Sequence, residues 1–493
     1  MRREIFAVGG VTLAMSLVAF TAHAASLQDA SKALGAAGAK TIEFSGAGQW
    51  FQFGQAPAPG LPWPRFDVST YVADINYETV SARVQSTRKQ TIEPGRARPT
   101  AVEQKNDAFV SGGFAWNVTP PPANAPAGTP PRNVPQPGGV EERVAEIWAT
   151  PQGFIKAALA NNAKSDTKGN AVEVSFTLGA KYHFTGTINE HNQLETVRTY
   201  IDTPVLGDTL VETKFSEYKD FGGVSFPAHI LRIEGGHPVL DLTVASVKLN
   251  APVEISVPAD VAAFKAPAQK VVVNKLADGV YYLTGGTHHS LAIEQKDHVV
   301  LVEAPLNEER SLALIAQIKQ TIPNKPIKYV VNSHVHFDHS GGLRTFVDAG
   351  AIVVTNEADK PFYEAAWAAP HGLNPDLLEK SKKAPKFETY KDKYVLSDGS
   401  RSIEVHKIAG NGHSDELALI YLPAEKILVE GDAYTPTAPN APAPVGVNPY
   451  TVNLDENIQR LKLDVVQIAA LHGPGVVKLD DLRAAISQSQ KTQ

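Results

Sequence analysis

The chain has 493 residues, of which 43% are hydrophobic and 20% charged, and its formal net charge at pH 7 is −6. A length beyond that of a usual single domain predicts two domains. The acidic balance argues against a nucleic-acid partner, which requires neutralisation of phosphates, and favours a small-molecule substrate. Because the sequence contains no cysteine, any metal must be held by nitrogen and oxygen atoms.

The first residues have the pattern of a secretory signal peptide. Arg2 and Arg3 precede an apolar run at 5–20, and Ala22-His23-Ala24 is a small-residue cleavage sequence. The run is short and is interrupted by glycine and hydroxyl side chains, so cleavage is favoured over a retained membrane anchor. We expect residues 1–24 to be removed, the mature protein to have no membrane span, and its location to be periplasmic or secreted. The arginine pair leaves Sec and twin-arginine export open.

Residues 25–250 are expected to form an antiparallel β-rich domain. Apolar and polar side chains alternate along most of this region, as at 172–178 and 240–244. A period of two predicts half-exposed antiparallel strands. One helix is predicted at 151–161. The segment 120–139, rich in proline, glycine and alanine, predicts an irregular excursion between strands, a solvated loop in preference to a flap over a site.

Residues 215–227 predict a strand, a turn and a strand, with the sequence Phe-Ser-Glu-Tyr-Lys-Asp-Phe-Gly-Gly-Val-Ser-Phe-Pro. This segment resembles outer-membrane lipoprotein-sorting, LolA-like domains, and the resemblance covers only part of this half of the chain. In that family a curved antiparallel sheet holds an apolar ligand. The resemblance therefore implies a lipid-binding or substrate-positioning role, and a purely structural sheet is the alternative.

The composition shifts at 251–269, where prolines interrupt a polar, alanine-rich run, and we expect a linker there. A second domain at 270–493 then begins with four short apolar segments in succession, predicted as strands at 271–273, 280–283, 291–294 and 299–302. Strand and helix segments alternate afterwards, with helices predicted at 312–319 and 360–369. This order predicts layered sheets flanked by helices, and hence an α+β chain of two domains.

The segment Ser333-His334-Val335-His336-Phe337-Asp338-His339 places three imidazoles and a carboxylate within six residues. It follows an apolar, β-branched run at 327–332, typical of a buried strand, and precedes Gly341-Gly342 and a helix predicted at 343–349. We therefore expect a strand-to-helix loop that aims His334 and His336 at one metal, with Asp338 and His339 turned toward a second. Imidazole with carboxylate suits zinc. A solvated histidine cluster is the alternative.

His-x-His-x-Asp-His after a strand, followed by further ligand-type residues on later loops, resembles the metallo-β-lactamase superfamily over residues 270–490. The later residues stand in the family's order, with His413 in a Gly-His-Ser setting, Asp432 after an apolar strand, and His472 in Leu-His-Gly. The resemblance implies a C-terminal αβ/βα sandwich with two zinc ions. By resemblance, one ion is bound by His334, His336 and His413, the other by Asp338, His339 and His472, and Asp432 bridges them.

Asp432 discriminates among branches of this superfamily. Its β-lactamases generally carry cysteine or serine at that position, whereas hydroxyacylglutathione hydrolases (glyoxalase II), lactonases and related esterases carry the bridging aspartate. A dedicated penicillin-cleaving enzyme is therefore disfavoured. At 301–305 the family usually has Asp-x-Gly as support for the metal ligands, and this chain departs from it with Glu303, which is expected to take over that role.

Two metals that share one hydroxide lower its pKa and polarise a carbonyl or phosphoryl oxygen. We therefore expect an exported dinuclear zinc hydrolase that attacks an ester, lactone or thioester with metal-bound hydroxide, Asp338 and Asp432 being catalytic through that hydroxide. The alternatives are phosphodiester, sulfate-ester or promiscuous β-lactam hydrolysis at the same site, a mononuclear iron dioxygenase, and a periplasmic carrier of apolar ligands with a vestigial metal domain. Retention of all seven ligand residues favours catalysis.

Other polar residues are candidates for the substrate pocket. His288 or His289, in the first predicted hairpin of the second domain, could donate a proton to the leaving group, and a structural histidine at a strand end is the alternative. Tyr434, His371 and the proline-rich segment 436–449 are weaker candidates for the pocket wall.

Overall fold

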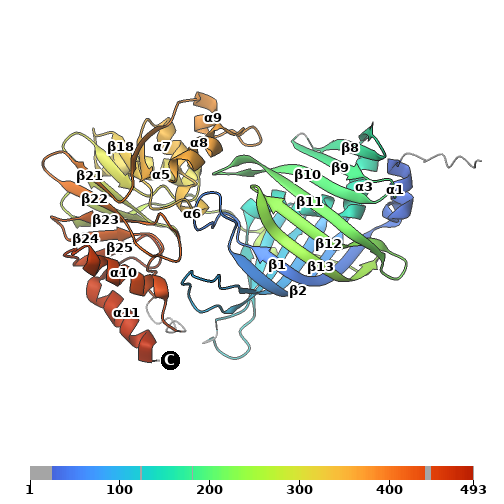
Figure 1. The fold of residues 1–493 in the computed structure, drawn as a ribbon, viewed down its shortest axis with the longest axis horizontal. Coiled ribbons are helices and arrows are strands. Elements are labelled where there is room, and N and C mark those ends of the chain that lie inside the picture. The colour runs from blue at the N-terminus through green and yellow to red at the C-terminus, as the bar shows by residue number, and fades with distance from the viewer. Residues whose placement is uncertain (1–24, 123–124, 180, 439–445, 492–493) are drawn as a thin grey trace, which may run out of the picture.

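The computed structural model describes residues 25–122, 125–179, 181–438 and 446–491. The predicted signal peptide at 1–24 lies outside these residues. The described chain forms two parts that lie side by side, a large sheet from the N-terminal half and layered sheets and helices from the C-terminal half (Figure 1). The predicted fold class, an α+β chain with an N-terminal antiparallel sheet, is confirmed. No helix of the described residues is long and apolar enough to cross a membrane.

Within the described residues, the N-terminal half builds one 13-stranded antiparallel sheet in the order β6-β5-β4-β3-β2-β1-β13-β12-β11-β10-β9-β8-β7. Its strands are β1 (Thr41–Phe51), β2 (Arg65–Asn76), β3 (Ser81–Gln90), β4 (Glu103–Ser111), β5 (Phe114–Thr119), β6 (Arg132–Pro135), β7 (Lys164–Lys168), β8 (Ala171–Leu178), β9 (Tyr182–Ile188), β10 (Leu194–Thr203), β11 (Gly207–Asp220), β12 (Ser225–Glu234) and β13 (His237–Leu249). Strands β1 and β13, the first and last along the chain, are neighbours inside the sheet, with Ile42 opposite Leu249. This pairing joins the two runs of strands into one sheet. Burial alternates along β8, as the period of two predicts.

Short helices accompany this sheet: α1 (Leu27–Ala33), the 3-10 turns η1 (Ala36–Gly38) and η2 (Pro137–Gly139), α2 (Val140–Trp148) and α3 (Pro151–Ala160). Helix α3 matches the prediction at 151–161, and the Thr150 side chain caps it by accepting a hydrogen bond from the Gly153 N–H. The prediction was wrong at two points. Helix α2 was not foreseen, and the segment 120–139 contains the edge strand β6. Pro135 is tolerated in β6 because an edge strand leaves some N–H groups unpaired.

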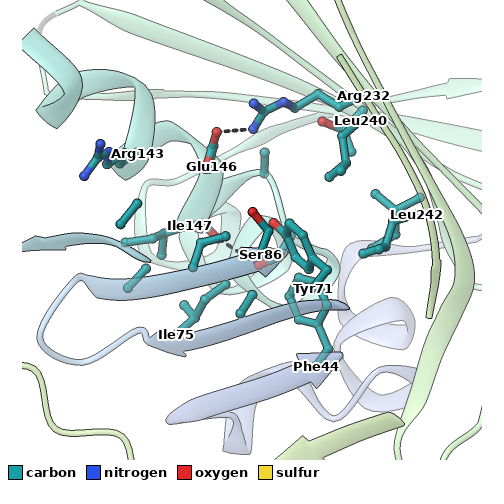
Figure 2. Close-up of a pocket in the computed structure, with 18 of the residues that line it drawn as sticks. Phe44, Tyr71, Ile75, Ser86, Arg143, Glu146, Ile147, Arg232, Leu240 and Leu242 are labelled. Atoms are coloured by element: carbon teal, nitrogen blue, oxygen red, sulfur yellow. Dashed lines mark hydrogen bonds and ion pairs between the residues drawn. The ribbon is translucent and has the colours of Figure 1, made fainter. Parts of the chain in front are cut away.

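A cavity of about 350 Å³ lies between the sheet and helices α2 and α3 (Figure 2). Its wall is mostly apolar, with side chains such as Phe44, Ile75 and Leu242. Arg232 reaches one end of the cavity and pairs there with Glu146 from α2.

Residues 250–271 connect the sheet to the C-terminal layers and contain α4 (Ala259–Ala262). The connection runs against the sheet, because the Ser111 hydroxyl donates to the Ile255 carbonyl at 2.9 Å and the Asn133 amide donates to Asp260 at 3.1 Å. The predicted linker at 251–269 falls within this connection.

The C-terminal half of the described chain contains a 7-stranded and a 6-stranded sheet, which run in chain order from β14 to β20 and from β21 to β26. The first comprises β14 (Val272–Ala277), β15 (Val280–Thr284), β16 (Ser290–Glu294), β17 (Val299–Val302), β18 (Ile327–Val331), β19 (Ile352–Asn356) and β20 (Lys386–Tyr390). The second comprises β21 (Lys393–Ser397), β22 (Ser402–Lys407), β23 (Ala418–Leu422), β24 (Ile427–Glu430), β25 (Gln467–Ala470) and β26 (Val476–Lys478). The four predicted opening strands correspond to β14 through β17.

Helices cover the outer faces of the two sheets: α5 (Glu308–Thr321), α7 (Leu343–Asp348), α8 (Lys360–Ala368), α9 (Leu377–Ser381), α10 (Pro449–Arg460) and α11 (Leu479–Lys491). The single turn α6 (Phe337–Ser340) carries part of the histidine motif and packs against the N-terminal half. One apolar core, which includes Val331 and Val429, lies between the two sheets. A second core packs α5 and α7 on the first sheet, and a third packs α10 and α11 on the other. The layer order is therefore helices, sheet, sheet, helices, as predicted for an αβ/βα sandwich.

The two halves meet where the segment between β1 and β2 reaches α6 (Figure 1). Trp63 and Phe53 of this segment lie edge-on to Phe337, with ring centroids 5.8 and 5.3 Å away. Ala56 and Val239 complete the apolar cluster. The N-terminal sheet is thereby packed directly against the element that carries the histidine motif.

Candidate metal centre

The histidine motif begins directly after β18 and passes into α6. His334 and His336 lie on the loop, whereas Asp338 and His339 lie in the single turn of α6, which is a small correction to the predicted loop. Gly341 ends this turn, and a Cβ there would approach the Leu306 carbonyl oxygen to 2.0 Å. Glycine is therefore required for α6 to pack this closely on the neighbouring backbone.

The remaining ligand-type residues follow strands of the second sheet. His413 lies on the loop between β22 and β23, Asp432 follows β24, and His472 follows β25. Strands β24 and β25 are parallel, as are β17 and β18 in the first sheet. Parallel neighbours bring their carboxyl ends to one edge, and the edges of the two sheets meet at the site.

A first cluster is formed by His334, His336, His413 and Asp432, whose ligand atoms all lie within 4.8 Å of one another. The Nε2 atom of His413 is 3.3 Å from that of His334 and 2.8 Å from Oδ2 of Asp432. His336 bonds the Ala56 carbonyl through Nε2 at 3.0 Å. Its Nδ1 atom is buried and has no hydrogen-bond partner in the described part of the chain. An orphaned imidazole nitrogen beside three other donors fits a bound metal.

A second cluster is formed by His288, Asp338, His339 and His472, with the same 4.8 Å limit between ligand atoms. The Nε2 atoms of His339 and His472 are 2.9 Å apart. Asp432 touches this cluster as well, because its Oδ1 lies 2.7 Å from Nε2 of His472 and its Oδ2 lies 3.2 Å from Nε2 of His339. The seven ligand residues inferred from the sequence are thus brought together, and the donor set fits a dinuclear metal site.

Glu303 supports the motif from the end of β17. It is fully buried, and its carboxylate lies 2.9 Å from Nδ1 of His339 and accepts hydrogen bonds from the Ser333 hydroxyl at 2.5 Å and the Asn332 amide at 3.1 Å. The Ser333 oxygen in turn lies 2.9 Å from Nδ1 of His334. Such partners fix the tautomers of both histidines and leave Nε2 directed at the metal. Glu303 therefore occupies the supporting position expected for it.

The N-terminal half also supports the motif through the segment between β1 and β2. The Gln55 amide donates to Oδ1 of Asp338 at 2.8 Å, and the Phe337 N–H donates to the Gly54 carbonyl at 3.1 Å. Together with the bond between the Ala56 carbonyl and His336, these bonds hold three consecutive residues of the motif, 336–338. Sequence reasoning missed them because Gln55 and Asp338 are 283 residues apart.

A second N-terminal segment, between β3 and β4, holds the loop that carries His413. Arg96 forms an ion pair with Asp415 at 2.8 Å. Gly412 lies so close to this segment that a Cβ would approach the Ala97 carbonyl oxygen to 1.7 Å. Two segments of the N-terminal domain therefore fix ligand loops of both sheets.

The weaker candidates from the sequence lie at different places. His289 bonds the Gly473 carbonyl through Nε2 at 2.8 Å. Tyr434 packs in the core beneath α10, and its N–H donates to buried Glu430. The His371 ring packs against Gly207 of the N-terminal sheet. Of the proline-rich segment 436–449, residues 439–445 lie outside the described residues.

Burial lowers the pKa of the buried histidines in both clusters, but nearby carboxylates outweigh burial at His339. Burial and the neighbouring His339 lower the pKa of His334 to about 4. Burial likewise holds the pKa of His336 well below its usual range. For His339, burial works to lower the pKa, but the carboxylates of Asp432 and Glu303 outweigh it and raise the pKa well above the usual range. His334 and His336 therefore present neutral imidazoles, whereas His339 holds a proton that a metal must displace.

Residues 283–478 match the family model described as metallo-beta-lactamase superfamily. The C-terminal domain belongs to this superfamily. The match leaves the N-terminal sheet unassigned, so its LolA-like resemblance stays a prediction. Together with the two clusters, the match identifies the C-terminal domain as a metal-dependent hydrolase domain of this superfamily.

Solved structures of metallo-β-lactamases resemble part of this chain. A metallo-β-lactamase from Pontibacter korlensis is 23% identical, with 45% of this chain and 99% of that chain covered and a TM-score of 0.34. The DIM-1 metallo-β-lactamase is 18% identical, with coverage of 45% and 99% and a TM-score of 0.34. The metallo-β-lactamase FIM-1 from Pseudomonas aeruginosa in its mono-zinc form is 18% identical, with coverage of 46% and 97% and a TM-score of 0.35. No curated protein sequence matches the chain.

Gln55→Ala should weaken binding of the second metal, because Asp338 loses the amide that orients its carboxylate. Loss of such an outer partner typically lowers metal affinity about 10- to 100-fold. Competition with a chromophoric chelator measures the effect on the full chain. Gln52→Ala is the matched control, since Gln52 bonds Pro64 through its backbone N–H. Equal losses in both variants, or none in Gln55→Ala, would contradict the positioning role.

Acidification should release the second metal before the first. Because the pKa of His339 is raised, protons compete for its Nε2 at a higher pH than for His334, whose pKa is about 4. Below the pKa of His339, the affinity of the second site should fall by about tenfold per pH unit, as for displacement of one proton. Dialysis at a series of pH values followed by elemental analysis measures the order of release. Simultaneous release of both metals would contradict it.

Proposed function

We propose that the chain is an exported dinuclear zinc hydrolase that opens an ester, a lactone or a thioester. The observation that carries the proposal is the position of Asp432 between the clusters, with Oδ2 2.8 Å from Nε2 of His413 and Oδ1 2.7 Å from Nε2 of His472. A carboxylate in this position supports a bridging role between two ions. By resemblance, the bridging aspartate belongs to the glyoxalase II, lactonase and esterase branch of the superfamily.

When bound, two zinc ions would supply a water of lowered pKa and polarise the substrate carbonyl. The residues of the chain hold the arrangement for this chemistry. Neutral imidazoles leave the cationic charge of a metal uncancelled, while Asp338 and Asp432 offset part of it. The Ala56 carbonyl presents Nδ1 of His336 to the centre, and Glu303 presents Nε2 of His339. The ligands are therefore held in position before substrate arrives.

Export is supported by the N-terminal sequence. Residues 1–24 combine two arginines, an apolar run and a small-residue cleavage sequence, and we assign the mature protein to the periplasm or the extracellular space on that pattern. The absence of cysteine is compatible with an oxidising compartment, because no thiol is available for oxidation.

The alternative substrate classes for the same centre are phosphodiesters, sulfate esters and β-lactams. The similar solved structures are named as metallo-β-lactamases, and that name describes those proteins. Asp432 favours the esterase-like branch for this chain, because the β-lactamases of the superfamily generally carry cysteine or serine there. The order of preference among substrate classes is therefore the property to measure.

The test is a panel of chromogenic ester, lactone, thioester, phosphodiester, sulfate-ester and cephalosporin substrates with the zinc-loaded full chain. Carboxylic and thioester substrates should be hydrolysed fastest. Asp432→Asn keeps the size of the side chain and removes its charge, and should lower kcat by more than the roughly 100-fold typical of outer-shell substitutions, with loss of the second zinc.

Asp464→Asn is the control for this panel, because Asp464 is an exposed aspartate that pairs with Lys426. Fastest turnover on a phosphodiester or a cephalosporin would overturn the assigned substrate class. Unchanged zinc content and unchanged kinetics in Asp432→Asn would overturn the bridging role.

The cavity in the N-terminal sheet favours a second function, the binding of an apolar ligand. Its volume is about 350 Å³ and its wall is mostly apolar, with the ion pair of Arg232 and Glu146 at one end (Figure 2). An apolar site with a few polar groups is typical of small-molecule binding. Because all seven metal-ligand residues are present, we assign this binding as an accompaniment to hydrolysis and not as its replacement.

Ser86→Trp should weaken binding of a fluorescent medium-chain fatty acid at least about tenfold, because an indole at this wall position would occupy part of the cavity. Ser69→Trp on the exposed side of β2 is the control and should bind as the wild type does. Fluorescence titration measures both, and the zinc content should be unchanged in each. Equal affinity in Ser86→Trp and wild type would contradict a binding role of the cavity.

A further inference from the structure

His288 is tied to a metal-ligand residue through the backbone. It lies between β15 and β16 and forms an isolated antiparallel bridge with His472. The next residue strengthens this connection, because the His289 N–H donates to the Leu471 carbonyl at 2.9 Å. The two histidines are therefore held side by side, with ring centroids 4.3 Å apart.

The His288 ring is oriented like those of the other ligand histidines. In each of His334, His336 and His339, one ring nitrogen contacts a protein oxygen. The other nitrogen lies beside Asp432 in His334 and His339, and in His336 it is buried without a hydrogen-bond partner among the described residues. His288 follows this pattern, since Nδ1 lies 2.8 Å from the Thr287 hydroxyl oxygen and Nε2 lies 3.1 Å from Oδ2 of Asp338. An outer partner on one nitrogen with the other nitrogen turned to a donor cluster is typical of metal-bound histidine.

A buried arginine fixes the backbone that carries His288. Arg310 of α5 is fully buried and donates to the carbonyls of Lys270 at 2.8 Å and Thr284 at 3.0 Å. It also lies 3.5 Å from the His288 carbonyl oxygen. The contacts of Arg310 thus fix the backbone of this turn, and the His288 imidazole is held in a defined position.

We propose that His288 is a ligand of the second metal, which is then held by His288, Asp338, His339, His472 and the shared carboxylate of Asp432. This inference rests on the proposed dinuclear centre. Two atoms bound to one zinc at the usual 2.0–2.1 Å lie roughly 3–3.4 Å apart, and the 3.1 Å between His288 and Asp338 agrees with this. The ligand atoms of His288, Asp338, His339 and His472 also lie within 4.8 Å of one another.

The consequence is an asymmetric centre. The first metal has His334, His336, His413 and Asp432, whereas the second has one protein donor more. The second ion therefore has fewer positions open to substrate and solvent than the first. The sequence alone had offered His288 only as a proton donor, and an imidazole bound to a metal through Nε2 has no proton there to give.

The test must separate a ligand from a histidine that only hydrogen-bonds Asp338. In the full chain loaded with Co²⁺, each ligating imidazole keeps one exchangeable N–H, whose proton signal the paramagnetic ion shifts far outside the ordinary range. We expect such signals from His288 and from each of the five predicted histidine ligands. His288→Gln should remove one signal and weaken the second metal by more than about 100-fold, beyond the range of outer-shell substitutions.

His289→Gln is the matched control, because His289 is adjacent and bonds the Gly473 carbonyl. It should keep every shifted signal, and His288→Asn provides a second replacement if the glutamine variant folds poorly. An unchanged number of shifted signals in a folded His288 variant that still binds two Co²⁺ would overturn ligation by His288 and leave the dinuclear centre intact. Uptake of no more than one Co²⁺ by the wild-type chain would instead overturn the dinuclear centre itself.

Discussion

The carboxylate of Asp432 is the interaction on which the site depends. Its two oxygens lie within 3.3 Å of the Nε2 atoms of His334, His339, His413 and His472, and these four residues come from both sheets of the sandwich. In a buried setting the attraction between such groups is stronger than in water. Burial works to raise the pKa of Asp432, but His339 and His413 outweigh it and hold that pKa well below its usual range. Asp432 is therefore ionised at the place where the edges of the two sheets meet.

Around this carboxylate, each ligand ring is oriented by a partner from a different part of the chain. Glu303 orients His339 from the end of β17, and Ser333 orients His334 from within the motif. The N-terminal domain supplies the Ala56 carbonyl for His336 and the Gln55 amide for Asp338. The apolar cores of the two domains are separate, yet their polar contacts converge on the same ligands. The metal centre is consequently a property of the whole chain and not of the C-terminal domain alone.

This arrangement gives the N-terminal sheet a direct role at the site in addition to its cavity. The cavity lies between the sheet and helices α2 and α3, whereas the contacts with the motif come from the segments that connect β1 to β2 and β3 to β4. The N-terminal sheet therefore has its cavity at one place and its contacts with the ligand-type residues at another. The buried cluster of Trp63, Ala56 and Phe337 joins the two regions through packing.

The resemblance to a known superfamily gave the full set of seven ligand residues. Local patterns in the sequence determined the period-two strands of the first domain, the alternating layers of the second, and the His-x-His-x-Asp-His motif. Such features depend on neighbours within a few residues, so periodicity and motif spacing reveal them. The sequence carried a signal for helix α2, whose apolar residues Val140, Val144 and Ile147 have helical spacing, but it did not reveal strand β6, which depends on pairing with β5. It also could not show that Gln55 meets Asp338, or that His288 lies beside His472 with its ring turned to the second cluster. Those positions follow from contacts between segments far apart in the chain, and only the tertiary structure decides them because no local propensity encodes a distant partner.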